Sequence, residues 1–550
     1  MLTMIKPFDD PKTRILMALS GKGKSMMVRI GLGACLLLLA ASAPLAKAPL
    51  DGAEAFTRHD FGAVNFRALD TVAVPWKLVA AALVLDDPHR GDVSQAHLKA
   101  RLQTFGFLWP ERIEGAGVPI TPSRDHPLGI SVGSVTPGLP PVKVTVANLG
   151  CASCHAGPAY AADGAPRPTT AWLGSPNTSL DLEAYTRAVT QALKRQSHDK
   201  PRLLAAVRTL FPETDRWEMA SLRWAVIPLA QRRLSQVPDG GSPLKFSNGS
   251  PGLTNGIAAL KLQGHTLSSA EEAGFTSIPD LADRSFRSAL LYDGAYAPQD
   301  QPRWRSMGRE DLTPEHRDRL AAITSFFTVP SMGQSPRGAH RQIPAAERAF
   351  TWLETRRPQA FPGPVDRAGA ARGAVVYARA CSSCHGVYSG SVERPRLERF
   401  PNWHGHVGSD PARAAAFTDD LTRYAGKGGY DKILDARPTG EYAATLLSGL
   451  WATAPYMHNG SVPTLAQFLL LEPRSERFLV GGHRLDFAAV GIAGRDQREV
   501  RVYPVGYTPW AQPMVFDTRM PGRSNRGHEA EVEGLTVAER RELIEYLKGL

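Results

Sequence analysis

Two short stretches carry residue types that can bind a metal or a prosthetic group: CASCH at residues 151–155 and CSSCH at residues 381–385. Each stretch places two cysteines three positions apart, with a histidine directly after the second. This C-x-x-C-H spacing is typical of haem c attachment, in which both thiols bond to the vinyl groups of the haem. The adjacent histidine is then placed to bind the iron, and the axial ligand is a main determinant of haem chemistry.

Three other chemistries use paired cysteines. A four-cysteine zinc site would leave both histidines unexplained and would join pairs that lie far apart in the chain. A redox dithiol expects a βαβ setting, which the sequence does not show. A disulfide suits an exported protein, but a disulfide between cysteines three positions apart would link little of the chain together. The sequence therefore predicts two covalently bound haem c groups, and the predicted attachment and proximal iron ligands are Cys151, Cys154, His155, Cys381, Cys384 and His385.

Residues 1–48 have the pattern of an export signal or an N-terminal anchor. The basic segment KGKSMMVR precedes the apolar run IGLGACLLLLAASAPLA, which is short for a membrane-spanning helix. The fifth cysteine, Cys35, lies inside this run. We therefore expect a protein that is exported to the periplasm or the cell exterior, with membrane attachment only if the signal is not cleaved.

The 550 residues are enough for two or three domains. The net charge of +11 comes without a basic run interleaved with aromatic residues, so nucleic-acid binding has little support. Apolar spacing predicts amphipathic helices over 183–195 and 217–234, whereas the Pro- and Gly-rich segments 127–142 and 245–256 are expected to be loops. The expected fold is mainly α-helical with little β structure. It has an N-terminal haem domain over 49–345, a linker within 325–346 and a C-terminal cytochrome c domain over 346–550.

The C-terminal region shows the helices that could frame a haem. Ala370, Gly373, Tyr377 and Cys381 recur at three- and four-residue intervals, which places them near one helical face. Gly373 would allow a second helix to approach closely. The segment 535–550 predicts that second helix, with a capping box formed by Thr536 and Glu539.

Several segments resemble a known family. GLWATAPYMHNGSVPTLAQFLL (449–470) resembles the TAPYxHDGSxxTL segment of the bacterial di-haem cytochrome c peroxidases. With FDTRMPGRSNRGHEA (516–530), NLGCASCHAG and SPNTSLDLEAY, it is still more similar to the longer branch that includes the haem-containing rubber oxygenases. The resemblance implies a largely α-helical protein with one haem per domain. One haem receives electrons, and the other has an open side where peroxide or dioxygen reacts.

The resemblance also implies roles for individual residues. His155 would be the proximal ligand at the reactive haem and His385 at the electron-accepting haem. His528, in SNRGHE, would be the distal ligand of the second haem, with Met457 as the alternative. In the sequence around His155 no second iron ligand is evident, and His265 is the nearest candidate from outside that segment. The remaining candidates for the second haem are Met514, Met520, His404, His406, His458 and His483.

One segment departs from the family. Where the family commonly has a tryptophan that relays electrons between the haems, the stretch ALLYDGAYAP has Tyr292. Tyr292 would either relay electrons or serve as a core tyrosine with its hydroxyl satisfied. No residue matches the distal glutamate of the peroxidases, which would act as a general acid and base on peroxide. Some relatives bind calcium between their domains, but the sequence shows no recognisable calcium site.

These observations favour an exported di-haem oxidoreductase. Its C-terminal haem would accept electrons from a small protein, a cytochrome c or a cupredoxin, and its N-terminal haem would react with peroxide or dioxygen. Two alternatives stay open. One is a non-catalytic electron-transfer cytochrome, in which both irons would be six-coordinate. The other is a rubber-type dioxygenase, which would differ in the pocket around the reactive haem.

Overall fold

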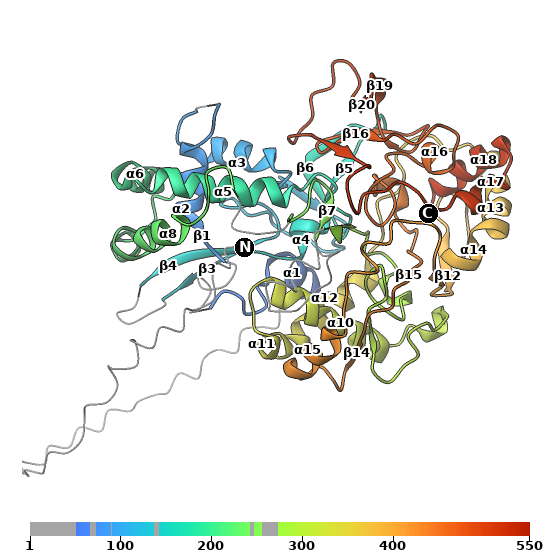
Figure 1. The fold of residues 1–550 in the computed structure, drawn as a ribbon, viewed down its shortest axis with the longest axis horizontal. Helices are drawn as coiled ribbons and strands as arrows, with labels where there is room; N and C mark the ends of the chain where they lie inside the picture. Colours follow the sequence, from blue (N-terminus) through green and yellow to red (C-terminus); the bar gives the residue numbers. More distant parts are fainter. Residues whose placement is uncertain (1–50, 66–72, 90, 137–141, 242–246, 256–272) are drawn as a thin grey trace, which may run out of the picture.

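The computed structural model describes residues 51–65, 73–89, 91–136, 142–241, 247–255 and 273–550. The predicted export signal, Cys35 and His265 lie outside these residues. The described chain is elongated in the view of Figure 1. A layer of helices from the N-terminal region, including α6 and α8, lies at one end, and α13 and α18 lie at the other (Figure 1).

The expectation of a mainly α-helical fold is wrong. The protein is 36% helical, and its described residues also form eight small sheets of two to four strands. It therefore has a mixed α/β fold. The segment 127–142, expected to be a loop, contains β3 (Ile130–Val135), which pairs antiparallel with β4 (Val144–Leu149). The β-branched residues of both strands favour this pairing, and the neighbouring glycines and prolines hid that preference.

The remaining strands are short, and many pair with partners far away in the chain. β1 (Val74–Pro75) extends the β3–β4 sheet. The other sheets are β2 (Arg112–Glu114) with β6 (Pro166–Leu173) and β5 (Ala156–Tyr160); β7 (Leu253–Thr254) with β8 (Thr276–Ser277); β9 (Tyr296–Pro298) with β14 (Leu434–Ala436); β10 (Met307–Gly308) with β12 (Arg396–Phe400) and β11 (Val387–Ser389); β13 (His404–Gly405) with β15 (Tyr442–Ala443); β17 (Leu485–Asp486) with β18 (Gly491–Ile492); and β19 (Arg495–Gln497) with β20 (Val500–Val502), β16 (Arg477–Val480) and β21 (Met514–Asp517).

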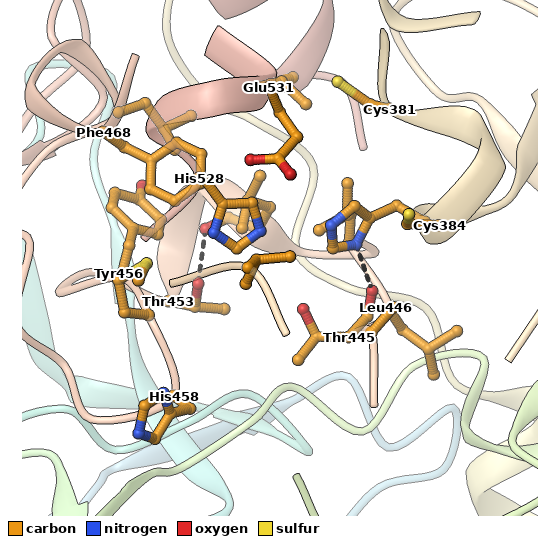
Figure 2. A pocket seen from close by; sticks show the side chains of 18 of the residues that line it. Cys381, Cys384, Thr445, Leu446, Thr453, Tyr456, His458, Phe468, His528 and Glu531 are labelled. Carbon is orange, nitrogen blue, oxygen red and sulfur yellow. Dashed lines mark hydrogen bonds between the residues drawn. The ribbon is translucent and has the colours of Figure 1, made fainter. Parts of the chain in front are cut away.

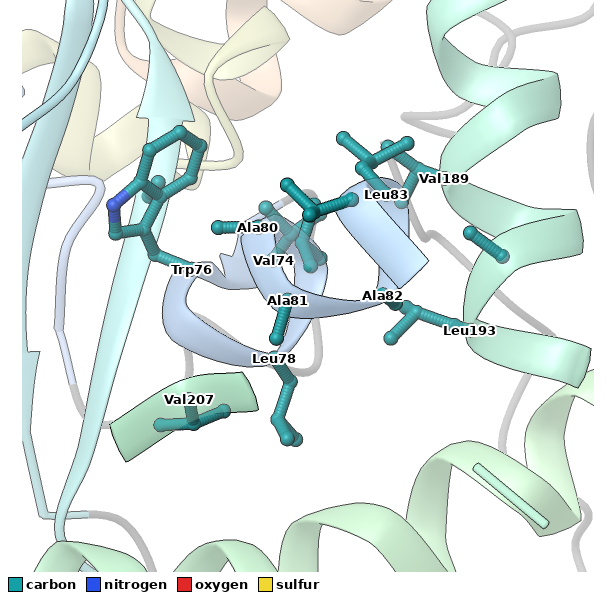
Figure 3. Packing of buried hydrophobic residues seen from close by; sticks show 14 of the residues in the cluster. Val74, Trp76, Leu78, Ala80, Ala81, Ala82, Leu83, Val189, Leu193 and Val207 are labelled. Carbon is teal, nitrogen blue, oxygen red and sulfur yellow. The ribbon is translucent and has the colours of Figure 1, made fainter. Parts of the chain in front are cut away.

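One hydrophobic core of the N-terminal region surrounds α2 (Trp76–Leu85), which is buried along nearly its whole length. Apart from Lys77, α2 is made of apolar residues, and such a helix must be covered on every side. The cover comes from β4, α3 (Gln95–Thr104), α5 (Leu182–Gln196) and α6 (Lys200–Leu210). Figure 3 shows Val189 and Leu193 approaching Leu83 and Ala82, and Val207 near Leu78.

Both amphipathic helices expected in this region are present. α5 covers the first predicted range, 183–195. The second range forms a continuous helical segment made of α7 (Arg216–Ser221), a π-helical turn over Leu222–Val226 and α8 (Ile227–Leu234). A buried ion pair joins this segment to α2, because Lys77 Nζ lies 2.8 Å from Glu218 Oε2.

The segment 325–346, expected to be a linker, is largely helical. It contains the end of α10 (Pro314–Ser331), α11 (Pro336–His340) and the start of α12 (Ile343–Thr355). Phe326, Val329 and Ala339 are buried there, and α12 packs against both α10 and α1 (Gly52–Arg58). The predicted boundary at residue 345 lies inside α12, and the division into two haem domains stays a prediction.

The helix pair expected in the C-terminal region is confirmed. α13 (Arg367–Ala380) packs against α18 (Val537–Leu547), and the capping box of Thr536 and Glu539 begins α18. A Cβ atom built on Gly373 would lie 2.0 Å from the carbonyl oxygen of Glu542, so only glycine permits this approach. The other helices of this region are α14 (Ser382–His385), α15 (Asp420–Gly428), α16 (Leu465–Phe468) and α17 (Glu529–Glu533).

We predict that Gly373→Ala destabilises the C-terminal region. The added methyl group would overlap the backbone of α18 and would force the helices apart, at a cost of about 1–3 kcal/mol in the free energy of unfolding. Gly426→Ala is the control, because Gly426 also lies in a helix and a Cβ atom added there would have no neighbouring atom within 4 Å. Guanidinium unfolding would measure both variants, and equal stability of the two would contradict the close helix crossing.

Candidate functional site

Each C-x-x-C-H motif forms one helical turn that lines a cavity. α4 (Cys151–Cys154) follows β4, and its cavity of about 320 Å³ is called the N-terminal cavity. Cys381 ends α13 and is followed by α14, and its cavity of about 250 Å³ is called the C-terminal cavity. In Figure 2, Cys381 and Cys384 border the C-terminal cavity opposite His528.

The cysteine pairs do not fit the other cysteine chemistries. They line different cavities, whereas a four-cysteine zinc site would need them together. All four thiols are free of disulfides. Burial raises the pKa of Cys151 to about 11 and that of Cys154 to about 12, and it also raises the pKa of Cys381 to about 11. A reactive redox dithiol needs the opposite shift, because the thiolate is its reactive form.

The two motif histidines are held in the same way. His155 Nδ1 lies 3.1 Å from the carbonyl oxygen of Pro279, and His385 Nδ1 lies 2.9 Å from that of Thr445. A carbonyl accepts only from a protonated nitrogen, so the bond fixes the tautomer that leaves Nε2 available to a metal. Burial lowers the pKa of His155 to about 4 and also lowers that of His385, which keeps both rings neutral.

His528 is the imidazole that faces His385. The centroids of the two rings are 6.3 Å apart, with an interplanar angle of 29°. An imidazole nitrogen lies about 2 Å from a metal that it binds, so two rings on opposite sides of one ion have centroids about 6 Å apart. His528 Nδ1 is buried and has no hydrogen-bond partner in the described chain. The cavity therefore fits a metal centre held between two imidazoles.

The loop before His528 is clamped by two other segments. Arg474 Nη2 donates to the carbonyl oxygen of Gly527 at 2.9 Å, and its Nη1 lies 2.8 Å from Glu529 Oε1. Asn459 Nδ2 donates to the carbonyl oxygen of Ser524 at 3.0 Å. His528 itself has a left-handed backbone conformation (φ 67°), which turns its side chain toward the cavity at the start of α17.

The other ligand candidates are placed less well. Met457 lines the C-terminal cavity, and its backbone carbonyl oxygen accepts from the Ser277 hydroxyl at 3.1 Å. His458 also lines the cavity, where its Nε2 lies 3.1 Å from the hydroxyl of Tyr442. The five remaining candidates do not line either cavity among the described residues; they are His404, His406, His483, Met514 and Met520.

The N-terminal cavity has a different composition. Among the described residues that line it, His155 is the one imidazole, and neither methionine nor glutamate is present. Much of the wall is apolar, and the aromatic side chains that line it include Phe56, Phe61, Phe327, Phe350 and Phe417.

Two arginines give the N-terminal cavity an unmatched positive charge. The Arg284 side chain lines it without an ion pair or hydrogen bond in the described chain, and the Arg287 side chain donates only to backbone carbonyls, including those of Ala289 and Leu291. Burial lowers the pKa of both guanidinium groups. Buried cations without carboxylate partners fit an anionic group in the cavity, such as the propionates of a haem.

One wall separates the two cavities. A buried ion pair stabilises this wall at Asp280. Arg356 Nη1 lies 2.6 Å from Asp280 Oδ1, and Arg356 Nη2 lies 3.1 Å from Asp280 Oδ2. Asp280 directly follows Pro279, so this pair fixes the carbonyl that holds His155. The wall residues that line both cavities are Ser277, Ile278, Pro279, Asp280, Tyr292, Thr445 and Leu446.

Tyr292 belongs to this wall. Its hydroxyl lies 2.7 Å from Ser277 Oγ, and its carbonyl oxygen accepts from the backbone N–H of Ala443 at 2.8 Å. Its ring centroid is 6.4 Å from that of His458. A place between the cavities suits an electron relay, and the satisfied hydroxyl suits a structural tyrosine. Both roles therefore stay open at this residue.

The sequence did not point to the residues that support the histidines. Pro279 and Thr445 act through backbone oxygens, which leave no mark in a side-chain pattern. Arg284 and Arg287 are two among many arginines, and their lack of a partner is visible only in the fold. Asp280 and Arg356 are 76 positions apart, so no local spacing could pair them.

Comparison with known proteins gives a match in the C-terminal region. Residues 440–479 match the family described as "RoxA-like, cytochrome c-like". The matched segment contains Thr445, which holds His385, and also Asn459, Phe468 and Arg474, which contact His528 or its loop. The match supports a relationship to haem-containing rubber oxygenases, and a cytochrome c-like domain implies covalently bound haem c.

Two curated relatives come from Sinorhizobium fredii. The uncharacterized protein y4iM is 28% identical over 233 residues, which are 35% of this chain and 50% of the relative. The uncharacterized protein y4iJ is 26% identical over 345 residues, which are 50% of this chain and 54% of the relative. The alignments thus span about half the length of these relatives. Within the described ranges, no helix combines the length and the apolar character that crossing a membrane requires.

We predict that His528→Ala changes the spectrum of the haem bound at His385. Without the second imidazole, the iron there should convert from a low-spin to a high-spin form. His406→Ala is the control, because His406 is an exposed imidazole near the same loop and does not line the cavity. Optical and EPR spectra of both variants would measure the change. Unaltered low-spin bands in His528→Ala would instead favour Met457 as the ligand.

Proposed function

We propose that this protein is an exported di-haem c-type oxidoreductase, in which electrons pass through the C-terminal cavity and dioxygen reacts in the N-terminal cavity. The main support for the proposal is that the two cavities differ in the number of imidazoles they offer to an iron. Two imidazoles face each other across the C-terminal cavity, whereas His155 stands alone among the described residues of the N-terminal cavity. The "RoxA-like, cytochrome c-like" match supports a haem oxidoreductase.

The chain supplies a complete set of groups for two haem c sites. Cys151, Cys154 and His155 would hold the first haem, and Cys381, Cys384 and His385 would hold the second. Arg284 would pair with a carboxylate of the first haem. Haem c, when bound, supplies an iron that carries single electrons and that binds a small molecule where an axial position is open.

The C-terminal cavity is suited to electron transfer. His385 and His528 would together hold the iron of the second haem, and a further ligand would then have to displace an imidazole. The clamp by Arg474 and Asn459 restrains His528 and makes that displacement costly. A fixed pair of ligands also limits the structural change that accompanies a change in oxidation state. We expect the electron partner to be a small cytochrome c or cupredoxin.

The N-terminal cavity favours dioxygen over peroxide as the oxidant. Peroxide cleavage benefits from a general acid and base beside the iron. Among the described residues lining this cavity, the carboxylate is that of Asp280, and the ion pair with Arg356 occupies it. The aromatic and aliphatic wall offers a dry environment, and an apolar organic molecule is the substrate class that suits it.

The proposal predicts that only the haem at His155 binds an added ligand. Cyanide or carbon monoxide should perturb one of the two haem signals, because no second histidine and no methionine lines the cavity of His155 among the described residues. EPR of the oxidised and half-reduced protein, with and without cyanide, would measure this. Two low-spin haems that ignore cyanide in both states would indicate an electron-transfer cytochrome. Peroxide consumption without oxygen uptake would instead favour a peroxidase.

A second prediction concerns Tyr292. If Tyr292 relays electrons, Tyr292→Phe should slow electron transfer between the haems by at least about tenfold, because phenylalanine is not oxidised under the same conditions. Flash-initiated single-turnover kinetics would measure the rate. Ser277→Ala is the control, since it removes the hydrogen bond to the Tyr292 hydroxyl but leaves the phenol. An unchanged rate in Tyr292→Phe would make Tyr292 a structural residue of the wall.

A further inference from the structure

The helical segment of residues 216–234 exposes large apolar side chains. Trp217 is 66% exposed, Trp224 is 73% exposed and Leu229 is 38% exposed. Both tryptophans are exposed whereas Met219 and Leu222 between them are buried, so the two rings lie on the outward side of the segment. Exposed tryptophan at this density is unusual on a soluble surface and marks a site of interaction.

The opposite side of the segment is firmly attached. Met219, Leu222, Val226 and Ile227 are buried in the core around α2. The Glu218 carboxylate accepts from Lys77 Nζ and also from the backbone N–H of Thr145 at 2.6 Å. These contacts fix the segment against the core. The segment therefore does not rotate about its axis to bury the two tryptophans.

The exposed side is also positively charged. Arg216, Arg223 and Arg232 are exposed and make no ion pair in the described chain. Arg216 lies 5.2 Å from the ring of Trp217, and Arg223 lies 5.1 Å from the ring of Trp224. The single acid between residues 216 and 234 is Glu218, which is buried. We call this surface the Trp–Arg face; it consists of Arg216, Trp217, Arg223, Trp224, Leu229 and Arg232.

We infer that the Trp–Arg face docks on an anionic phospholipid surface. Indole rings are enriched at the level of the lipid headgroups, where an apolar ring and a polar N–H are both accommodated. Guanidinium groups pair with phosphate, and an anionic leaflet attracts basic residues that lie near it. A helix with one apolar, basic side that lies in the plane of the interface meets these requirements.

Docking in this way would orient the molecule. α8 lies at the end of the molecule opposite α13 and α18 (Figure 1). The C-terminal region would then point away from the lipid and would stay accessible to a soluble partner. The inference does not depend on which reaction the haems perform, because it rests on the surface of a segment that lines neither cavity.

The test is binding of the purified, haem-loaded full chain to vesicles, measured by co-sedimentation. Vesicles of phosphatidylcholine with phosphatidylglycerol are compared with vesicles of phosphatidylcholine alone. The variants are Trp217→Ser with Trp224→Ser, and Arg216→Gln with Arg223→Gln and Arg232→Gln. The controls replace exposed residues elsewhere, Val505→Ser and Arg394→Gln. Hydrogen exchange over residues 216–234 reports contact at this face separately from any contribution of residues 1–48.

We expect binding that requires phosphatidylglycerol and weakens as salt is raised. Each arginine replacement should weaken partition about fivefold, and each tryptophan replacement should weaken it on the order of tenfold. Vesicles should slow hydrogen exchange over residues 216–234. The inference is overturned if the variants bind like the controls, if exchange there is unchanged, or if the tryptophan variant instead loses a dimer without changing vesicle binding.

Discussion

The carbonyl oxygens of Pro279 and Thr445 accept hydrogen bonds from the Nδ1 atoms of His155 and His385. Both carbonyls belong to the one wall that separates the two cavities. The backbone of this wall therefore holds the Nδ1 side of each histidine ring. The orientation of each ring therefore depends on this wall. The buried ion pair of Arg356 and Asp280 stabilises the same wall. Loss of either partner would leave an unpaired charge buried beside it.

The second imidazole of the C-terminal cavity depends on contacts of a different kind. His528 stands in a loop, and a loop can place a ligand accurately only when its backbone is tied down. Arg474 and Asn459 provide those ties from a part of the chain more than fifty residues earlier. Asn459 lies in the motif APYMHNG, and the tied backbone lies in SNRGHE. The two resembling segments therefore form one structural unit in which the first positions the second.

The features that could be predicted from the sequence are those that depend on residues close together in the chain. The C-x-x-C-H motifs, the helix α5 and the α13–α18 pair with its capping box all depend on residues close in sequence, and the structure contains each of them. The small sheets were missed because strands of two to eight residues pair with distant partners, such as β9 with β14. The helices within segment 325–346 were missed because its small and polar residues hid the helical spacing of Phe326 and Val329.

The difference between the cavities has a physical origin in what surrounds each motif. His385 faces a loop whose backbone is tied down by hydrogen-bond donors, so a side chain can be held across the cavity from it. Among the described residues, the cavity of His155 is lined by five phenylalanines, which fill space but offer an iron no ligand, and by no second histidine or methionine. Arg284 would attract an anionic group to that side without coordinating a metal. If both motifs bind haem as proposed, one attachment motif repeated in two surroundings would give one site closed by protein ligands and one that stays open.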